Sequence, residues 1–147
     1  MNIEFRKAII PDELPALCEF DKKAFHAHPA DLFSEDDWKQ YESWWMTLDG
    51  ITVGCIALQT DTKDELWISS TGLLPEFCGR GLGNRIKQWE IDYAKSNGYS
   101  LIGTMMRESN ERIIGLNKKF GFSVLTIVES AYSGPDEAGI VMVLHLS

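Results

Sequence analysis

The pattern of hydrophobic and polar positions along the first half of the chain predicts strands and short helices. In order, we expect a strand over residues 3–8, a helix over 11–24, a loop over 25–33, and a short helix from residue 34 that carries Trp38 and Tyr41. Two apolar runs follow, at 44–48 and 51–58, with Asp49-Gly50 between them. Asp-Gly between two such runs is a strong hairpin signal, so we expect the runs to be paired strands.

The second half of the chain alternates apolar strands with amphipathic helices. We expect a strand over residues 66–74, a helix after a glycine-rich turn, a strand over 100–105, a helix over 110–119, and final strands over 122–131 and 139–146. The buried face of the first of these helices is expected to comprise Leu82, Ile86, Trp89 and Tyr93. Gly98 is placed to end that helix. The order β-α-α-β-β-β-α-β-α-β-β predicts a mixed α/β fold.

The composition is that of a globular protein without a membrane span. The 147 residues are 44% hydrophobic and 24% charged, which fits a single domain over residues 1–147. No apolar run approaches the roughly 20 residues that cross a bilayer, and the N-terminus lacks the apolar core of a secretory signal. Cys18, Cys55 and Cys78 are scattered without the spacing of a metal site. We therefore expect free thiols, no bound metal and a cytoplasmic location.

The negative charge is concentrated in the first part of the chain. Residues 1–65 hold 14 Asp and Glu against 6 Lys and Arg, whereas residues 66–147 hold 8 acidic and 8 basic residues. A net charge of −8 argues against nucleic acid and anionic membranes as partners. An acidic first half suits a cationic substrate such as an amine, and it serves equally well to keep the protein soluble.

A glycine-rich turn before the helix that follows residue 81 carries the clearest functional signal. Gly79, Gly81 and Gly83 occupy alternate positions there. Glycines let backbone N–H groups converge on one point, and the start of a helix is the positive end of its dipole. The turn therefore predicts a phosphate site. Its spacing is not that of a dinucleotide fingerprint, because Asn84 occupies the sixth position, and the end of a P-loop is absent.

This turn resembles the acyl-CoA loop of the GNAT family of N-acetyltransferases, whose pattern is Arg/Gln-x-x-Gly-x-Gly/Ala. Gly81 and Gly83 fill the two small positions, while Cys78 replaces the usual Arg or Gln. The family's loop holds the pyrophosphate mainly through backbone amides, and Arg80 still supplies local positive charge. The resemblance therefore tolerates the missing side chain at Cys78.

A second block, over residues 107–122, resembles the family's next strand-to-helix segment. Asn110 stands at the start of the helix, and Gly121-Phe122 leads into the following strand. In the family, this Asn contacts the pantetheine arm. Because the two blocks lie in the family's order and cover most of residues 50–147, the resemblance implies the GNAT fold, a mixed and mostly antiparallel sheet flanked by helices.

The resemblance implies acetyl-CoA as co-substrate and direct attack by an amine in a ternary complex. The residues that match the family's cofactor positions are Leu73, Leu74, Cys78, Gly79, Arg80, Gly81, Leu82, Gly83, Asn84, Asn110 and Asn117. Leu73 is expected to polarise the thioester carbonyl through its backbone N–H, at a bulge that Gly72 permits. Its neighbour Leu74 would add further backbone pairing to pantetheine.

The catalytic base and acid of the family are only partly matched. Histone-type members carry a Glu thirteen residues before the Arg/Gln position, which corresponds to Glu65, although an exposed acid in a polar turn is the more ordinary interpretation. Members that acetylate ribosomal-protein N-termini have a Glu where this chain has Met105. Most members have a Tyr acid where this chain has Asn117, which can donate a hydrogen bond but no proton. Tyr132 is an alternative acid, or a residue that packs against the substrate.

The substrate wall of the family comes from the first two helices and the loop between them. The candidates in this region are Phe25, His26, His28, Phe33, Asp36, Asp37, Trp38 and Tyr41. Aromatic and carboxylate side chains can together hold a protonated amine. Core packing is the alternative role for Trp38 and Tyr41. His26 and His28 supply half a metal site with no third ligand, so we expect no metal there.

Three hypotheses follow for the function. The first is acetylation of a small cationic amine, favoured because Asn at position 117 also occurs in family members that act on small molecules. The second is acetylation of a peptide or protein N-terminus, favoured by Arg107-Glu108-Ser109-Asn110 and Tyr132 and disfavoured by Met105 and Asn117. The third is a non-catalytic acyl-CoA-binding module. The sequence leaves a homodimer open as a further partner.

Overall fold

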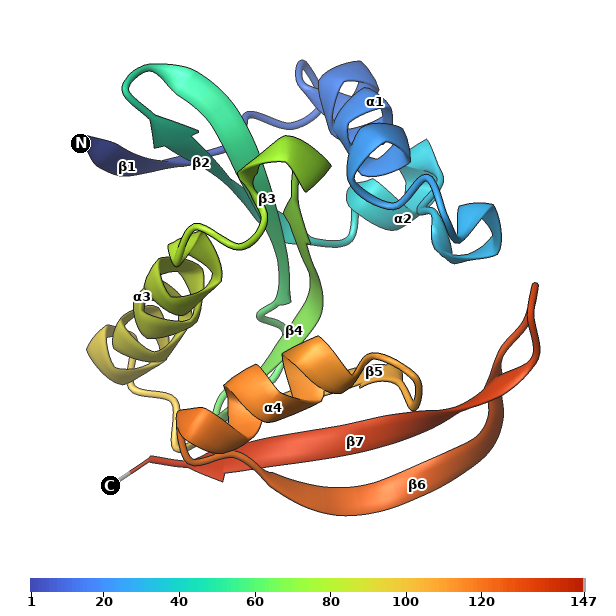
Figure 1. Ribbon diagram of the computed structural model, residues 1–147. Coiled ribbons are helices and arrows are strands. Elements are labelled where there is room, and N and C mark those ends of the chain that lie inside the picture. The colour runs from blue at the N-terminus through green and yellow to red at the C-terminus, as the bar shows by residue number, and fades with distance from the viewer. Residues whose placement is uncertain (147) are drawn as a thin grey trace.

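A computed structural model describes residues 1–146 as one seven-stranded sheet with helices on both faces (Figure 1). The strands lie in the order β1-β2-β3-β4-β5-β7-β6, and only β4 and β5 are parallel. Their bounds are β1 Ile3–Lys7, β2 Glu42–Leu48, β3 Ile51–Gln59, β4 Glu65–Leu73, β5 Leu101–Arg107, β6 Ser123–Tyr132 and β7 Glu137–His145. This is the mixed, mostly antiparallel sheet that the sequence predicted.

The helices bury two separate apolar clusters, one on each face of the sheet. Their bounds are α1 Leu14–Ala24, η1 Pro29–Asp31, α2 Glu35–Trp38, η2 Pro75–Phe77, α3 Leu82–Ser96 and α4 Glu111–Lys119. Side chains of α3 pack on one face with Ile56 and Ile102, and those of α1 and α2 pack on the other with Trp45 and Cys55. Across residues 1–146, no helix is long and apolar enough to cross a membrane.

Most local predictions are confirmed by the structure. Ser34 and Asp37 form the capping box, and Asp49-Gly50 turns the β2–β3 hairpin with positive φ at both residues. The helix expected from Pro11 begins only at Leu14, because the preceding residues form a turn in which the carboxylate of Glu13 accepts a hydrogen bond from the backbone N–H of Ile9. This local side-chain bond competes with an earlier helix start.

Strands β4 and β5 separate halfway along their length, and this split positions the site. Their parallel pairing ends at Ile68 and Thr104, after which β4 pairs only with β3 and β5 only with β7. The irregularity in β4 lies at Ser69, where the register with β3 shifts, so the bulge predicted at Gly72 and Leu73 is wrong.

Gly72 has a different role, because it lets α1 approach the sheet. A Cβ at this position would lie 3.1 Å from Cε2 of Phe25 and 3.3 Å from Cβ of Ala24. Both distances are shorter than ordinary van der Waals contacts, so any larger residue would push α1 away from β4. The glycine thus serves helix packing rather than a bulge.

Candidate active site

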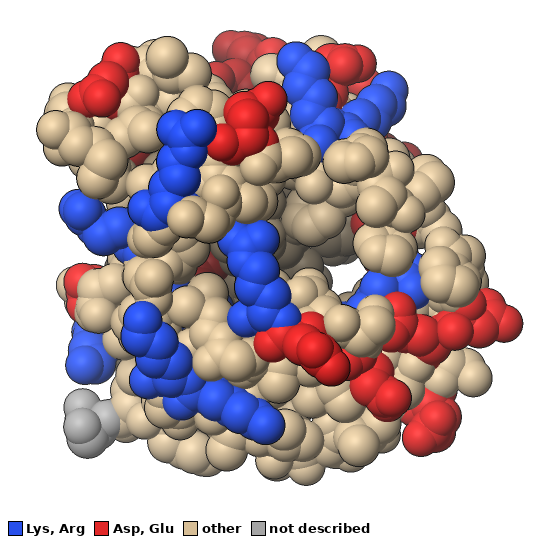
Figure 2. Space-filling model, in the orientation of Figure 1, with Lys and Arg blue, Asp and Glu red and all other residues tan. Residues whose placement is uncertain are grey.

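A cavity of about 870 Å³ passes through the split between β4 and β5. Figure 2 shows its opening as a hollow between the regions of α1 and α4. One half lies among α3, α4 and the glycine turn, and we call it the cofactor half. The other half lies among α1, the loop that follows it, and the ends of β5 and β6, and we call it the acceptor half. Of the residues predicted to bind the cofactor, seven line the cavity: Leu73, Gly79, Gly81, Gly83, Asn84, Asn110 and Asn117.

The glycine turn has the shape expected of a pyrophosphate cradle. Gly79 and Gly81 have φ of +78° and +80°, and a Cβ built on either one would meet no atom within 4 Å. The space they leave open belongs to the cavity, and Gly81 is the N-cap of the 15-residue helix α3 without a side-chain cap. The first N–H groups of α3 are therefore free for an anion. These residues fit the phosphates of an acyl-CoA.

Other predicted members of the loop contribute in different ways. Cys78 and Arg80 do not line the cavity: the thiol of Cys78 contacts the carbonyl of Leu74 at 3.7 Å, and the guanidinium of Arg80 lies 5.1 Å from the ring centroid of Phe77. The side chain of Leu82 is buried in the core. The loop therefore depends on its backbone, not on the side chains at these positions.

The free edge of β4 faces the split. The backbone N–H of Leu74 donates to the carbonyl of Val53 on β3, at 2.9 Å. Because the N–H groups of a strand alternate between its two edges, those of Leu73 and Thr71 point away from β3 and toward the space that β5 has left. Leu73 is thus placed as predicted for a group that binds the thioester carbonyl. The N–H of Leu74 is already bonded to Val53, so it is not free for the backbone contact with pantetheine that we predicted for this residue.

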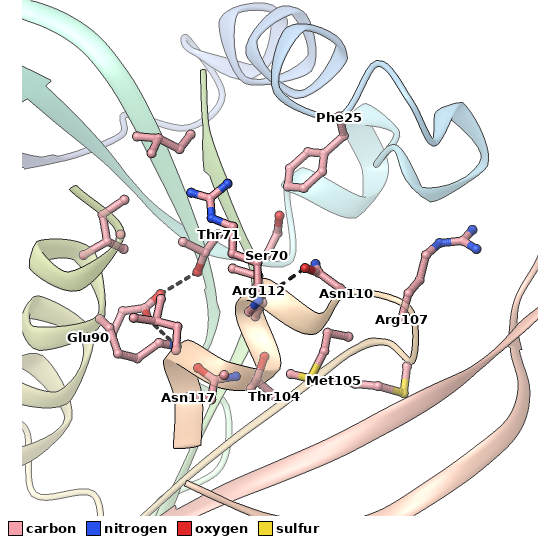
Figure 3. Close-up of a pocket in the computed structure, with 18 of the residues that line it drawn as sticks. Phe25, Ser70, Thr71, Glu90, Thr104, Met105, Arg107, Asn110, Arg112 and Asn117 are labelled. Atoms are coloured by element: carbon pink, nitrogen blue, oxygen red, sulfur yellow. Dashed lines mark hydrogen bonds and ion pairs between the residues drawn. The ribbon is translucent and has the colours of Figure 1, made fainter. Parts of the chain in front are cut away.

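Helix α4 forms the opposite wall of the cofactor half. Asn110 is its N-cap, and its side-chain oxygen accepts a hydrogen bond from the N–H of Ile113 at 3.3 Å (Figure 3). Asn117 is completely buried. Its amide nitrogen lies 3.8 Å from the sulfur of Met142, and within residues 1–146 its side-chain oxygen has no hydrogen-bond partner. Asn117 therefore presents unused hydrogen-bonding capacity at the position of the family's acid.

Arg107 organises the acceptor half. Its guanidinium is 5% exposed and donates to both carboxylate oxygens of Asp31, at 2.7 and 2.9 Å, and to Glu137 at 2.9 Å. It also lies 4.8 Å from the ring centroid of Tyr132. Burial raises the pKa of the Tyr132 phenol, and the nearby Asp31 adds to this effect. Tyr132 therefore lines the cavity as a neutral aromatic residue held by Arg107.

Several predicted site residues lie outside the cavity. Glu65 begins β4 and Leu73 ends it, so at about 3.3 Å per residue their Cα atoms lie roughly 26 Å apart. Glu65 is exposed and does not line the cavity, which contradicts its prediction as the base. Counting thirteen residues back from the loop reaches the end of β4 that lies far from the split.

The predicted substrate wall is also only partly correct. Phe25 lines the cavity, whereas the side chains of His26 and Asp36 are exposed away from it. Trp38 is 2% exposed and packs edge-on against Phe33, with Tyr41 beside it. Core packing, the alternative role, is the one that the structure gives to Trp38 and Tyr41. The short helix needs their rings to hold it against α1.

The ionisable residues of the cavity that the sequence analysis missed include three buried ones, Asp21, Lys87 and Glu90. Asp21 of α1 is 4% exposed and lines the acceptor half, where one carboxylate oxygen accepts a hydrogen bond from the N–H of Phe33 at 2.9 Å. Burial raises the pKa of Asp21 to about 6. Lys87 and Glu90 of α3 line the cofactor half, nearly without solvent exposure. The sequence did contain a signal for two of them, because Lys87 and Glu90 interrupt the apolar stripe of α3.

Comparisons with known proteins agree with this geometry. A family model described as the acetyltransferase (GNAT) family matches residues 12–122. The [ribosomal protein bS18]-alanine N-acetyltransferase of Escherichia coli K12 is 27% identical over 139 residues, which cover 92% of this chain and 93% of that protein.

Solved structures show the same fold. The crystal structure of the E. coli ribosomal-protein-S18-alanine N-acetyltransferase has a TM-score of 0.86 at 23% identity, covering 99% of this chain and 95% of that one. A GNAT family acetyltransferase from Elizabethkingia anophelis with acetyl-CoA bound has a TM-score of 0.83 at 17% identity, covering 99% of each chain. Arabidopsis thaliana Naa50 in complex with the bisubstrate analogue CoA-Ac-MVNAL has a TM-score of 0.84 at 18% identity, covering 99% of this chain and 100% of that one.

Proposed function

The chain belongs to the GNAT family of acetyltransferases and is an acetyl-CoA-dependent N-acetyltransferase; from this premise we propose that its acceptor is the α-amine of a peptide or protein N-terminus. The observation that carries the proposal is the acceptor half of the cavity, which continues through the sheet to the free edge of Leu73. Phe25, Met105 and Tyr132 give it apolar walls suited to the first residue of a peptide.

The relatives support a peptide rather than a small molecule as acceptor. The E. coli relative, which matches over nearly the whole chain, acts on the alanine of a ribosomal protein. The Arabidopsis neighbour binds an analogue that joins CoA to a peptide. None of these supports the small cationic amine favoured by the sequence analysis, and Asn117, on which that preference rested, lies in the cofactor half, away from the acceptor. A peptide that begins with a small residue such as alanine is the first candidate.

The residues of the chain would divide the reaction between the two halves. Acetyl-CoA supplies the activated acetyl group, and the glycine turn and the edge of β4 would bind and orient it. The Leu73 N–H would hold the carbonyl oxygen, and a fixed hydrogen-bond donor there stabilises the charge that develops on it. In the acceptor half, we propose Asp21 as the group that takes the proton of the incoming ammonium. Its desolvated carboxylate is placed for this, because Asp31 is already bound by Arg107.

The experiment compares acceptors of different classes in one assay. Purified protein is incubated with acetyl-CoA and peptides that begin with Ala, Ser, Met or Pro, alongside polyamines and aminoglycosides, and products are identified by mass spectrometry. Each peptide is matched by one with a formylated N-terminus and an internal lysine. Acetylation of the free α-amine alone supports the proposal. Transfer only to polyamines, aminoglycosides or the internal lysine would refute it.

A further inference from the structure

The cofactor half contains a buried ion pair on α3. The ammonium nitrogen of Lys87 lies 2.9 Å from Oε1 of Glu90, and the two side chains are 6% and 0% exposed. The other carboxylate oxygen of Glu90 accepts a hydrogen bond from the hydroxyl of Thr71 on β4, at 2.6 Å. Figure 3 shows Thr71 and Glu90 pointing toward one another across the cavity wall. The pair thus ties α3 to the free edge of β4.

As a purely structural feature, this buried pair would lower the stability of the fold. Removing two charges from water costs several kcal/mol per ion, and replacing a buried pair by apolar residues is often neutral or stabilising. The neighbouring buried positions of α3 are Leu82, Ile86, Ile91 and Ala94, all apolar. Apolar residues at positions 87 and 90 would continue this stripe. The charges therefore call for a role other than packing.

The hydrogen bonding of the pair is incomplete. Within residues 1–146, Oε1 of Glu90 and Oδ1 of Asn117 are buried without a hydrogen-bond partner. The ammonium of Lys87 lies 2.9 Å from that oxygen of Glu90, so the two groups form an ion pair. An ammonium has three donors. Charge attraction thus holds Lys87 in place while its N–H groups stay available to a ligand in the cavity.

The location of Lys87 matches the place where an acid is needed. Thr71 lies on the same edge of β4 as Leu73, and Asn117 faces them from α4 at the family's acid position. Asn117 has no proton to give. Lys87 lines the same part of the cavity, with its ammonium 5.0 Å from the ring centroid of Phe122.

The other basic side chains that line the cavity are placed for different tasks. The ammonium of Lys119 donates to Asn84 beside the glycine turn, at 2.9 Å, and Arg112 is exposed on the first turn of α4. Arg107 belongs to the acceptor half and is bound by Asp31 and Glu137. Of the basic residues described in this cavity, Lys87 is the one that is both buried and on the cofactor side.

We propose that Lys87 donates the proton to the departing CoA thiolate, with Glu90 and Thr71 as positioning residues. The inference rests on the acetyl transfer proposed above. The amine nitrogen forms a bond to the carbonyl carbon, the carbon–sulfur bond breaks with its electron pair on sulfur, and one proton passes from the Lys87 ammonium to that sulfur. Asp21 passes the first proton, taken from the incoming ammonium, to solvent before it takes the second proton, which the bound amine releases on attack, and solvent returns a proton to Lys87.

The test uses a variant that removes the pair without stranding a charge. The double variant K87M/E90L is expected to fold with unchanged or higher thermal stability. Its kcat at saturating peptide should fall by about 10²-fold or more, the usual contribution of a general acid, while its Kd for acetyl-CoA stays within about threefold. Lys95→Met, an exposed lysine on the same helix, is the matched control and should leave kcat unchanged.

A second measurement tests Lys87 without requiring acetyl transfer. The thiol of bound CoA is titrated by its ultraviolet thiolate absorbance, and the Lys87 charge should make it ionise at lower pH in the wild type than in the double variant. Adding N117Y to the double variant should restore at least about tenfold of the lost kcat, because a phenol then occupies the family's acid position. Unchanged kcat together with an unchanged thiol titration would overturn the proposal. If wild-type protein acetylated no peptide, the titration alone would still decide the role of Lys87, so the two failures are distinguishable.

Discussion

Arg107 and Asp31 form a two-bonded ion pair that joins the end of β5 to η1, across 76 residues of sequence. The same guanidinium donates to the carbonyls of Ser133 and Pro135 in the turn between β6 and β7. One buried side chain therefore fixes the three segments that bound the acceptor half. The shape of that half therefore depends on Arg107.

Replacing Arg107 by Met should destabilise the protein and impair acceptor binding. It would leave Asp31 and Glu137 without their cation and remove the hydrogen bonds that the guanidinium donates to Ser133 and Pro135, so the loss should exceed that of an exposed ion pair. KM for the peptide should rise more than Kd for acetyl-CoA, because the glycine turn is remote from Arg107. Thermal unfolding and steady-state kinetics provide the measurements. The control is Arg6→Met, which removes the partly exposed pair with Glu13 and should cost under about 1 kcal/mol. Equal losses in the two variants would contradict the structural role of Arg107.

Gly81→Ala should weaken acetyl-CoA binding beyond its effect on stability. The residue has φ of +80°, and its added methyl group would project into the cavity. Gly98→Ala is the matched control, because Gly98 has φ of +79° with open space around it and lies outside the cavity. Both variants should lose roughly 1–2 kcal/mol of stability from the left-handed backbone. Calorimetric titration with acetyl-CoA should show a loss of affinity in the Gly81 variant alone. If both variants bound acetyl-CoA with equal affinity, the glycine turn would not be part of the cofactor site.

Asp21→Asn should raise stability at neutral pH while lowering activity. The folded-state pKa of about 6 exceeds the ordinary value near 3.9, so folding favours the protonated form. Wild-type stability is therefore lost as pH rises between about 4 and 6, and the cost above that window is at most about 3 kcal/mol.

The Asp21 variant avoids this cost, so the two proteins should differ in unfolding free energy at pH 7.5 and agree near pH 4. Denaturant unfolding at both values gives the measurement. If Asp21 is the base, kcat should also fall by about 10²-fold. A variant that is less stable than wild type at pH 7.5 would contradict the raised pKa of Asp21, and an unchanged kcat would contradict its catalytic role.

Glu65→Gln should leave activity within about twofold of wild type at every pH. The residue is exposed at the end of β4 opposite to Leu73 and does not line the cavity. A surface carboxylate so far from the split has no path to the amine proton. The kcat/KM profile from pH 6 to 9 is the measurement. If the variant lost the rise of kcat/KM toward alkaline pH, Glu65 would be the base after all.

The order of elements and the cofactor turn could be predicted from sequence because their causes are local. Positive φ at Gly79 and Gly81, the Asp49-Gly50 turn and the Ser34 capping box depend on residues adjacent in the chain. The amphipathic stripe of α3 was also predicted, although its buried residues include Lys87 and Glu90, which a hydrophobic pattern does not reveal. Trp89 and Tyr93 are only partly buried; Trp89 stacks on Phe5, and Tyr93 packs edge-on against Trp44.

By itself, the sequence determined the strands and helices, their order and the glycine turn before α3, since these follow from periodicity and turn chemistry within a few residues. Only the tertiary structure decided which side chains share the cavity. Asp21, Lys87 and Arg107 lie far apart in sequence and meet because β4 and β5 diverge after Ile68 and Thr104. Glu65 lies outside the cavity because it belongs to the part of β4 that is still paired with β5. Burial and charge pairing across the sheet are properties of the packed chain, and they give these ionisable groups their chemistry.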